Sequence, residues 1–235
     1  GVSQAAYTEG LNYARERRQF ETNIIDFPAV YDMLSRMKAK LDAGRSILYQ
    51  TARYVDIYKA LDDIARERKL TPEERAEQKK YMRLADAFTP LAKGMNSEYA
   101  NQNAYDAIQI HGGSGFIMEY KSQRLYRDAR IFSIYEGTTQ LQVVAAIRYI
   151  TNGTYLGIMK ESGNQDRQDF LARRLYEMTA ELFMSLLIIA DASKAPELFE
   201  KSANVYVRMT EEAVIGSHAF IANFKVEDLE SYKAR

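Results

Sequence analysis

Three segments of this 235-residue chain carry residue types that could do chemistry. They are residues 13–20 (YARERRQF), 109–116 (QIHGGSGF) and 127–142 (RDARIFSIYEGTTQLQ). The first gathers guanidinium groups, the second is a glycine-rich turn, and the third places a glutamate before a glycine and two threonines. Guanidinium groups bind anions, a bare glycine backbone admits a ligand, and a positioned carboxylate moves protons.

Each segment also has a purely structural explanation when it is taken alone. An arginine-rich helix end is usually a solvated face that the helix dipole favours. Gly112 and Gly113 would ordinarily stop a helix, and Glu136 before a glycine and two threonines would ordinarily be a turn into a helix cap. His111 is more often structural than a ligand, and a lone glycine-rich turn is weak evidence for nucleotide binding. The joint occurrence of the segments is therefore the stronger observation.

In this order and spacing, the segments resemble the C-terminal helical domain of the acyl-CoA dehydrogenase family. That domain typically shows Y-A-x-x-R-x-Q-F-G, then Q-x-x-G-G-x-G-[YF], then R-D-A-[RK]-I and I-Y-E-G-T-[ST]-Q-[IL]-Q. The chain matches these motifs throughout except at the last glycine of the first, where it has Glu21. The resemblance covers about residues 1 to 152, and the combined motifs are highly specific.

The resemblance implies a flavoenzyme that catalyses α,β-dehydrogenation of acyl-CoA thioesters, the chemistry of fatty acid β-oxidation. In the family a carboxylate removes the α-proton while a hydride leaves the β-carbon for N5 of FAD, and the motif makes Glu136 this base. Desolvation by bound substrate would strengthen Glu136 as a base, and its backbone N–H would help a flavin hydroxyl to stabilise the thioester oxygen. Gly137 would let the backbone approach the substrate, and Tyr135 would wall the acyl pocket. Some members carry the base on an earlier helix, and the presence of Glu136 favours the commoner arrangement.

The first motif resembles a cofactor-binding segment of the family. By the resemblance, Arg17 would meet the FAD pyrophosphate as a charge-assisted donor, and Phe20 would pack near the adenosine half. Glu21 in place of glycine leaves open the conformation of the turn after Phe20, but not the Arg17 contact.

The other motifs resemble two further cofactor contacts. Gln109, Gly112 and Gly113 would approach the adenosine portion of FAD, and in family tetramers they come from a neighbouring subunit. Thr138 and Gln140 would reach the FAD of their own subunit, beside the base. The implied partners are an acyl-CoA substrate, other copies of the chain in a homo-oligomer (dimer or tetramer), and an electron-transfer flavoprotein or similar acceptor.

Helices are expected to position all of these residues, because helix formers abound and there are only four prolines. Apolar spacing predicts helices over about 3–20, 72–111, 122–130 and 171–189, with a last one starting at Pro196. Capping signals predict two more, one from a cap at Asp26 to about residue 61 and one from a cap at Thr138 or Thr139 to about residue 152. No alternating run is long enough to indicate a sheet. The predicted fold class is all-α: a four-helix-bundle-like acyl-CoA dehydrogenase domain over residues 1–153, with extra C-terminal helices over residues 154–235.

Composition excludes several other classes. Lysine plus arginine equals aspartate plus glutamate at 32 each, so no net field favours nucleic acid or an anionic membrane. The absence of cysteine excludes disulfides and thiolate metal sites, and two distant histidines argue against a histidine metal cluster. No secretory signal or bilayer-length apolar run is visible, which favours a cytoplasmic protein. The chain starts at Gly1 in the middle of a helical pattern, which suggests a fragment or a processed form.

Two other functions remain open at this stage. An acyl-CoA oxidase shares the fold but passes electrons to oxygen, although the Glu-Gly-Thr-Thr-Gln form favours the dehydrogenase. The family's N-terminal helical domain and central β domain have no counterpart in these residues. The isolated chain is therefore expected to be inactive, and a non-catalytic helical oligomerisation module is the alternative for the chain by itself.

Overall fold

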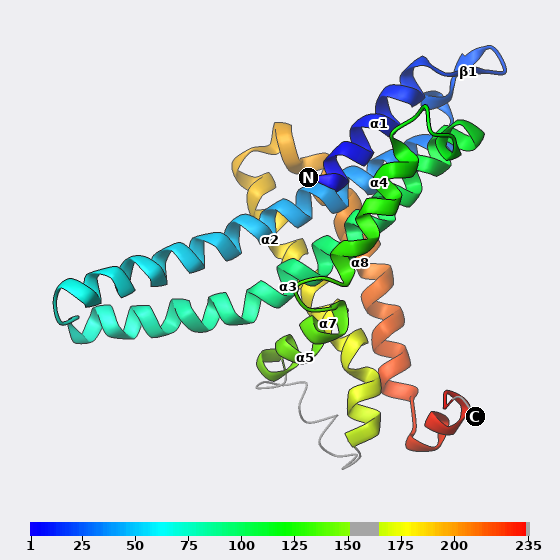
Figure 1. Cartoon of the computed structure of the whole chain (residues 1–235). Helices are drawn as coiled ribbons and strands as arrows, with labels where there is room; N and C mark the ends of the chain where they lie inside the picture. Colours follow the sequence, from blue (N-terminus) through cyan, green and yellow to red (C-terminus); the bar gives the residue numbers. More distant parts are fainter. Residues whose placement is uncertain (151–164, 234–235) are drawn as a thin grey trace. The chain divides into compact units, whose positions relative to one another are not determined.

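The structure, a computed structural model, describes residues 1–150 and 165–233, and this part of the chain is almost entirely helical (Figure 1). The α-helices are α1 (Val2–Glu16), α2 (Pro28–Glu67), α3 (Pro72–His111), α4 (Ser122–Ala129), α5 (Thr139–Ile150), α7 (Gln165–Lys194) and α8 (Pro196–Asn223). The short 3-10 helices are η1 (Ile24–Asp26), η2 (Gly112–Phe116), η3 (Arg130–Ser133) and η4 (Val226–Ser231). The predicted all-α fold class is confirmed.

Most predicted helix boundaries follow from local capping chemistry. Helices begin at Pro28, Pro72, Thr139 and Pro196, and α3 ends where glycine follows His111. At the start of α3 the Thr71 N–H donates to Glu74 Oε2 at 2.9 Å, and the Glu74 N–H donates to Thr71 Oγ1 at 3.2 Å. This reciprocal pair is a capping box. The predicted domain boundary after residue 153 lies outside the described residues.

The predicted first helix is wrong at its C-terminal end. α1 stops at Glu16, and the chain then forms a small antiparallel hairpin of β1 (Arg18–Gln19) and β2 (Thr22–Asn23). Its two-residue turn has positive φ at Phe20 (47°) and Glu21 (66°), as a type I′ turn requires. The Arg18 Nη2 donates to the Glu21 carbonyl at 2.6 Å and closes the turn. Glu21 thus adopts a left-handed conformation at the position where the family motif has glycine.

The chain divides into two compact units, and each of the long helices α2 and α3 contributes residues to both units. The first unit contains residues 1–46, 94–139 and 184–208, and the second contains residues 47–93, 140–183 and 209–235. Segments from the beginning, middle and end of the sequence therefore build each unit.

Small side chains fill the core of the first unit, which lets its helices approach closely. The buried cluster joins α1, η1, α2, α3 and α4 through Ala6, Ala14, Ile24, Leu34, Met37, Ala104, Ala107, Ile110 and Ala129. Helices α2 and α3 are in contact at Gly44, where the Asn96 Nδ2 donates to the Gly44 carbonyl at 3.1 Å. A Cβ atom at Gly44 would overlap with the Asn96 side-chain oxygen. A larger residue at position 44 would therefore force the Asn96 side chain to move.

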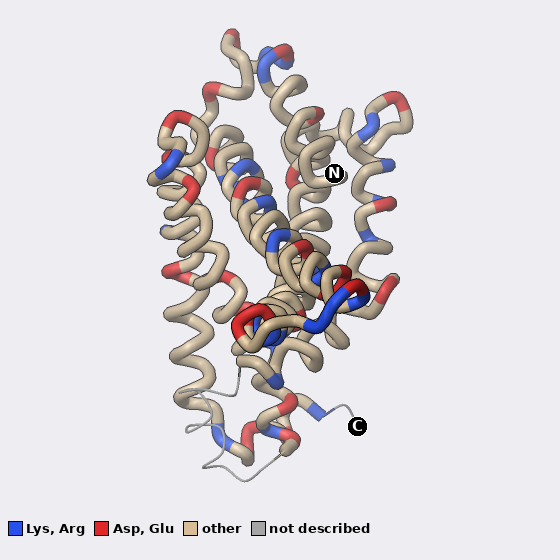
Figure 2. The backbone as a smooth tube through the Cα atoms, turned by 90° about the vertical axis from the view of Figure 1, so that its left-hand side faces the viewer, with Lys and Arg blue, Asp and Glu red and all other residues tan. Residues whose placement is uncertain are grey.

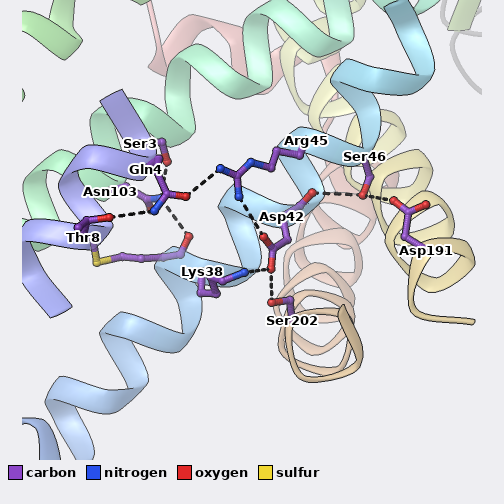
Figure 3. Close-up of polar contacts among 11 residues, drawn as sticks. Ser3, Gln4, Thr8, Lys38, Asp42, Arg45, Ser46, Asn103, Asp191 and Ser202 are labelled. Carbon is purple, nitrogen blue, oxygen red and sulfur yellow. Dashed lines mark hydrogen bonds and ion pairs between the residues drawn. The ribbon is translucent and has the colours of Figure 1, made fainter. Parts of the chain in front are cut away.

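A buried carboxylate on α2 organises the polar contacts of the first unit (Figure 3). Asp42 is 1% exposed, forms an ion pair with Lys38, and accepts a hydrogen bond from the Ser202 hydroxyl of α8 at 2.6 Å. One turn along α2, the Ser46 hydroxyl donates to Asp191 of α7 at 2.6 Å. Because an unpaired buried charge is costly, these contacts specify how residues 184–208 pack on α2.

Aromatic and aliphatic side chains form the core of the second unit. One cluster of its buried residues contains Leu171, Leu175, Met178, Ile221, Phe224 and Leu229. The Arg167 guanidinium, itself buried, donates to the carbonyls of Phe224 at 3.0 Å and Ile221 at 3.4 Å, and so caps the end of α8. The Tyr176 hydroxyl donates to the Pro90 carbonyl inside α3 at 2.9 Å.

Charges of both signs recur along the helices (Figure 2). This distribution agrees with the balanced composition. Within the part of the chain that the structure describes, no helix combines the length and the apolar character that crossing a lipid bilayer requires.

Candidate functional site

The end of α1 and the glycine turn after α3 lie side by side in the first unit. The Tyr13 ring stacks on the His111 ring with centroids 4.2 Å apart, and the Tyr13 hydroxyl donates to Ser114 Oγ at 3.2 Å. Tyr13 precedes Arg17 by about one helical turn, and His111 directly precedes Gly112. The structure therefore brings the first and second sequence motifs to one end of this unit.

The glycine turn presents bare backbone outward. Gly112 has a φ of +60°, and for Gly112 and Gly113 no heavy atom of the described residues lies within 4 Å of an added Cβ. Gly115 differs, because its Cβ would meet the Ile108 carbonyl oxygen at 2.7 Å. Gly115 is thus needed for packing, whereas Gly112 and Gly113 leave open space that a ligand can enter. Gln109 lies beside them with an exposed side chain.

The buried His111 ring packs next to the glycine turn. The Nδ1 of His111 lies 2.7 Å from the Ala107 carbonyl oxygen, and the Tyr120 ring meets the His111 ring edge-on with centroids 5.4 Å apart. Burial lowers the pKa of His111 below its usual range, so the neutral ring is favoured. These contacts make His111 a packing residue of the site.

Arg17 and Phe20 are available to a binding partner. The Arg17 side chain is exposed and makes no ion pair within residues 1–150 and 165–233. Phe20, at the tip of the hairpin, is 90% exposed, with only an edge contact to Phe27 at 6.5 Å between ring centroids. An exposed arginine beside an exposed aromatic ring is an arrangement that suits an anionic, aromatic ligand.

The Glu136 segment has an unusual backbone. Glu136 has a φ of +54° and Gly137 a φ of +89°, between η3 and α5. Left-handed φ is uncommon for a residue with a Cβ, and such strained positions cluster at functional sites. Glu136 is exposed, Tyr135 is half-exposed, and Thr138 directly precedes α5. Gln140 is the second residue of α5.

This segment is anchored on α3. The Thr139 hydroxyl, 2% exposed, donates to Glu98 Oε1 at 2.6 Å. Asn101, one turn further along α3, donates through Nδ2 to the Ala129 carbonyl at 3.1 Å. Sequence reasoning missed both Glu98 and Asn101. The sequence shows polar residues at 96–98 and 101–103, but it carries no signal for their distant partners.

The two groups of predicted site residues attach to separate places on α3. Glu98 anchors the Glu136 segment, and His111 supports the glycine turn, thirteen residues later in the same helix. At 1.5 Å per residue, these positions are about 20 Å apart along the helix axis. The structure therefore gathers the predicted site residues of the first unit into two regions, whereas Gln140 belongs to the second unit.

Comparison with known families identifies the chain. The family described as "Acyl-CoA dehydrogenase, C-terminal domain" matches residues 1–150, and "Acyl-CoA dehydrogenase C terminal" matches residues 134–229. The chain belongs to the acyl-CoA dehydrogenase family. The second match extends the family relationship to all of α7 and α8, which the sequence motifs did not reach.

Curated relatives of this acyl-CoA dehydrogenase domain include both dehydrogenases and reductases. The caffeyl-CoA reductase-Etf complex subunit CarC of Acetobacterium woodii is 38% identical over 60% of this chain and 31% of its own length. The 3-methylmercaptopropionyl-CoA dehydrogenase of Ruegeria pomeroyi is 38% identical over 60% of this chain and 24% of its own length. The chain thus spans less than a third of the length of these relatives.

A solved acyl-CoA dehydrogenase from Bacillus anthracis shares the fold over nearly the whole chain. It covers 98% of this chain and 48% of its own, with a TM-score of 0.71 and 20% identity. That structure is described as a complex with FAD.

Proposed function

We propose that this chain is the C-terminal part of a flavin-dependent acyl-CoA dehydrogenase that removes one hydrogen each from the α- and β-carbons of an acyl-CoA thioester. The observation that carries the proposal is the turn at Glu136, which holds a carboxylate in a left-handed backbone at the surface of the first unit. Such a conformation is costly for glutamate, and it places the side chain where a substrate can reach it.

Glu136 is the group that accepts the α-proton. Its carboxylate oxygen takes the proton as the α-carbon–hydrogen bond breaks, and the electron pair moves toward the thioester carbonyl. The Glu136 backbone N–H is proposed to donate to the thioester oxygen as negative charge develops there. Gly137 lets this backbone approach the substrate, and Tyr135 lines the acyl group. When it is bound, FAD supplies the acceptor for the hydride of the β-carbon.

The residues at the end of α1 and at the glycine turn suit the adenosine and pyrophosphate portions of FAD. Arg17 has an exposed guanidinium for a phosphate, and Phe20 has an exposed ring for an aromatic base. The open backbone at Gly112 and Gly113 and the Gln109 amide can approach the same portion. Their fit to FAD is therefore good in residue type and in accessibility.

The two regions on α3 support binding to two different FAD molecules. Arg17 and the glycine turn are at one level of α3, and Thr138 follows the base at a level about 20 Å away. Thr138 and Gln140 are proposed to hold the FAD of their own subunit, whereas the glycine turn contacts the FAD of a neighbour. This division implies a homo-oligomer, with a dimer as the smallest assembly.

Similarity to relatives supports proposals for the electron carrier and for a second reaction. One relative is a subunit of a reductase–Etf complex, which favours an electron-transfer flavoprotein as the electron carrier of this enzyme. The same relative supports a second candidate function, the reduction of a 2-enoyl-CoA, in which Glu136 returns the α-proton. Turnover with oxygen as sole acceptor would instead indicate an acyl-CoA oxidase.

We retain the cytoplasm as the proposed location.

The direct test of the base is Glu136→Gln in the full-length protein. We expect FAD to remain bound, because the amide preserves the shape of the side chain. Flavin reduction by acyl-CoA under anaerobic conditions should slow by at least roughly 10²- to 10⁴-fold, the range for loss of a general base. Absorbance of the oxidised flavin measures both quantities.

Glu73→Gln is the matched control, because Glu73 is an exposed glutamate in the first turn of α3. It should leave both FAD binding and flavin reduction unchanged. Normal reduction kinetics in Glu136→Gln would remove Glu136 from the role of base.

A further inference from the structure

The segment that carries Glu136 is attached to α3 at both of its ends. Before it, the buried Ala129 carbonyl accepts a hydrogen bond from Asn101 Nδ2 at 3.1 Å. After it, the buried Thr139 hydroxyl donates to Glu98 Oε1 at 2.6 Å. Residues 130–138 therefore form a loop whose two ends are fixed by side chains of a single helix.

Glu98 and Asn101 act from one face of α3. They are three residues apart, a spacing that places side chains next to each other on a helix. Asn101 is itself held, because its Nδ2 also donates to the Ser97 carbonyl at 2.8 Å within the same helix. The Glu98 carboxylate gives a short, charge-assisted hydrogen bond, which is stronger than a bond between neutral groups. The α3 face thus offers two defined attachment points for the loop.

The loop needs such attachment because its backbone is strained. Glu136 has a φ of +54° in a residue with a Cβ, and this conformation costs on the order of 1 to 3 kcal/mol. A strained position persists only where the surrounding structure fixes it. Ends that were free to move would let Glu136 relax to negative φ and would turn its carboxylate in another direction.

We propose that Glu98 and Asn101 are positioning residues that hold Glu136 in the geometry for proton abstraction. This inference rests on the proposed function, because it assumes that Glu136 is the base. Neither residue touches the substrate in this proposal. Glu98 acts through Thr139, and Asn101 acts through the Ala129 backbone. Proton transfer depends steeply on distance, and a displacement of 1 Å can cost 10²-fold in rate.

The test compares variants that remove the Glu98–Thr139 hydrogen bond with variants that keep it, all in the full-length FAD-containing protein. Glu98→Ala and Thr139→Val remove it, and Thr139→Val does so with almost no change in shape. Glu98→Gln keeps an acceptor oxygen, and Thr139→Ser keeps the hydroxyl. Asn101→Ala tests the other end, and Glu73→Ala is the control on an exposed part of α3.

Two rates are measured for each variant. The first is flavin reduction at saturating acyl-CoA, together with the apparent Kd of the substrate. The second is exchange of the α-hydrogens with D₂O in an acyl-CoA whose β-carbon is replaced by an ether oxygen, followed by mass spectrometry. This compound has α-hydrogens but no β-hydride to give, so exchange reports on the base alone.

We expect Glu98→Ala, Thr139→Val and Asn101→Ala to slow both rates by roughly 10- to 100-fold with the apparent Kd unchanged. Thr139→Ser and Glu73→Ala should stay near the wild-type rates, and Glu98→Gln, which keeps an acceptor but loses its charge, should be faster than Glu98→Ala. The double variant Glu98→Ala/Thr139→Val should be no slower than either single variant, because both remove one interaction. Flavin absorbance confirms that each variant still holds FAD.

Wild-type exchange in Glu98→Ala and Thr139→Val, with exchange abolished in Glu136→Gln, would overturn the positioning role and leave the base intact. Normal exchange in Glu136→Gln would instead overturn the proposed base and the positioning role together. If Glu98→Ala fails to fold, Thr139→Val decides the question, since a wild-type rate in that variant alone contradicts the proposal.

Discussion

Glu181 on α7 is a half-buried acid whose charge the fold disfavours. Burial raises its pKa from 4.5 to about 7, and the negative charge of Glu177 adds to the effect. Glu177 itself is ion-paired with Arg173 at 2.8 Å. At neutral pH and above, the charge on Glu181 therefore lowers the stability of the folded state.

The pH dependence of stability follows from this shift. Because the folded pKa lies above the ordinary value, the folded state keeps a proton that the unfolded state loses between pH 4.5 and 7. The folding stability that the protonated form of Glu181 preserves is fully present below pH 4.5 and is lost as the pH rises through 7. We expect Glu181→Gln to raise the thermal unfolding midpoint at about pH 8 and to have little effect near pH 5.

Thermal unfolding of the full-length protein, followed by circular dichroism at both pH values, measures this difference. Glu197→Gln is the control, because Glu197 is an exposed acid at the start of α8. An equal shift at both pH values would show that the charge of Glu181 is not the cause.

Single residues differ in how far the sequence alone could place them. Thr71 and Glu74 were predictable, because a capping box is a local pattern of four residues. Glu98 and Asn101 were not, because their partners lie 41 and 28 residues further along the chain. The roles of Glu136 and Arg17 came from a family resemblance, and they stay predictions until the variants are measured.

At the scale of helices, periodicity predicted the elements but misplaced several ends, among them both ends of α7, which runs from Gln165 to Lys194 rather than over about 171–189. The α2 helix runs to Glu67 rather than to about residue 61, because the charged residues that follow are good helix formers. Arg66 also pairs with Asp63 at 2.9 Å on the surface of this last turn. The α1 helix ends early, because the two-residue turn at Phe20 and Glu21 favours a hairpin over a further helical turn.

The crossing of α2 and α3 gives a prediction about packing. Gly44→Ala should destabilise the protein by about 1 to 3 kcal/mol, because the added methyl group overlaps with Asn96 in a packed region. Chemical denaturation of the full-length protein measures the change in unfolding free energy. Gly216→Ala in α8 is the control, since no heavy atom of the described residues lies within 4 Å of its added Cβ.

The two variants should have opposite signs. In an exposed helix interior, alanine is more favourable than glycine by about 1 kcal/mol, so Gly216→Ala should stabilise. Equal and small effects at both positions would mean that α2 and α3 can separate enough to admit a side chain.

At the scale of the whole molecule, the chain spans 31% and 24% of the length of two curated relatives. Sequence reasoning gave the family and the fold class, but not the two compact units, because each unit combines segments that lie far apart in sequence. Periodicity indicates where a helix lies in the sequence. It does not indicate which part of a 40-residue helix packs into the core of which unit.

The isolated chain should therefore bind FAD weakly and lack activity. The residues proposed to contact FAD are all exposed or near a surface turn, and the proposal gives them contacts with only part of the cofactor. We expect the purified chain, incubated with FAD and then desalted, to lose the flavin absorbance and to leave acyl-CoA unchanged. A yellow preparation that reduces its flavin with acyl-CoA would contradict this prediction.

The left-handed backbone at Glu136 implies a trade-off between stability and activity at one residue. Backbone preference alone would select glycine or asparagine there, since both enter this region more easily than glutamate. If Glu136 is the base, the enzyme accepts a less stable loop in return for a reactive carboxylate. Screens that reward thermostability alone would then enrich replacements at this position that silence the enzyme.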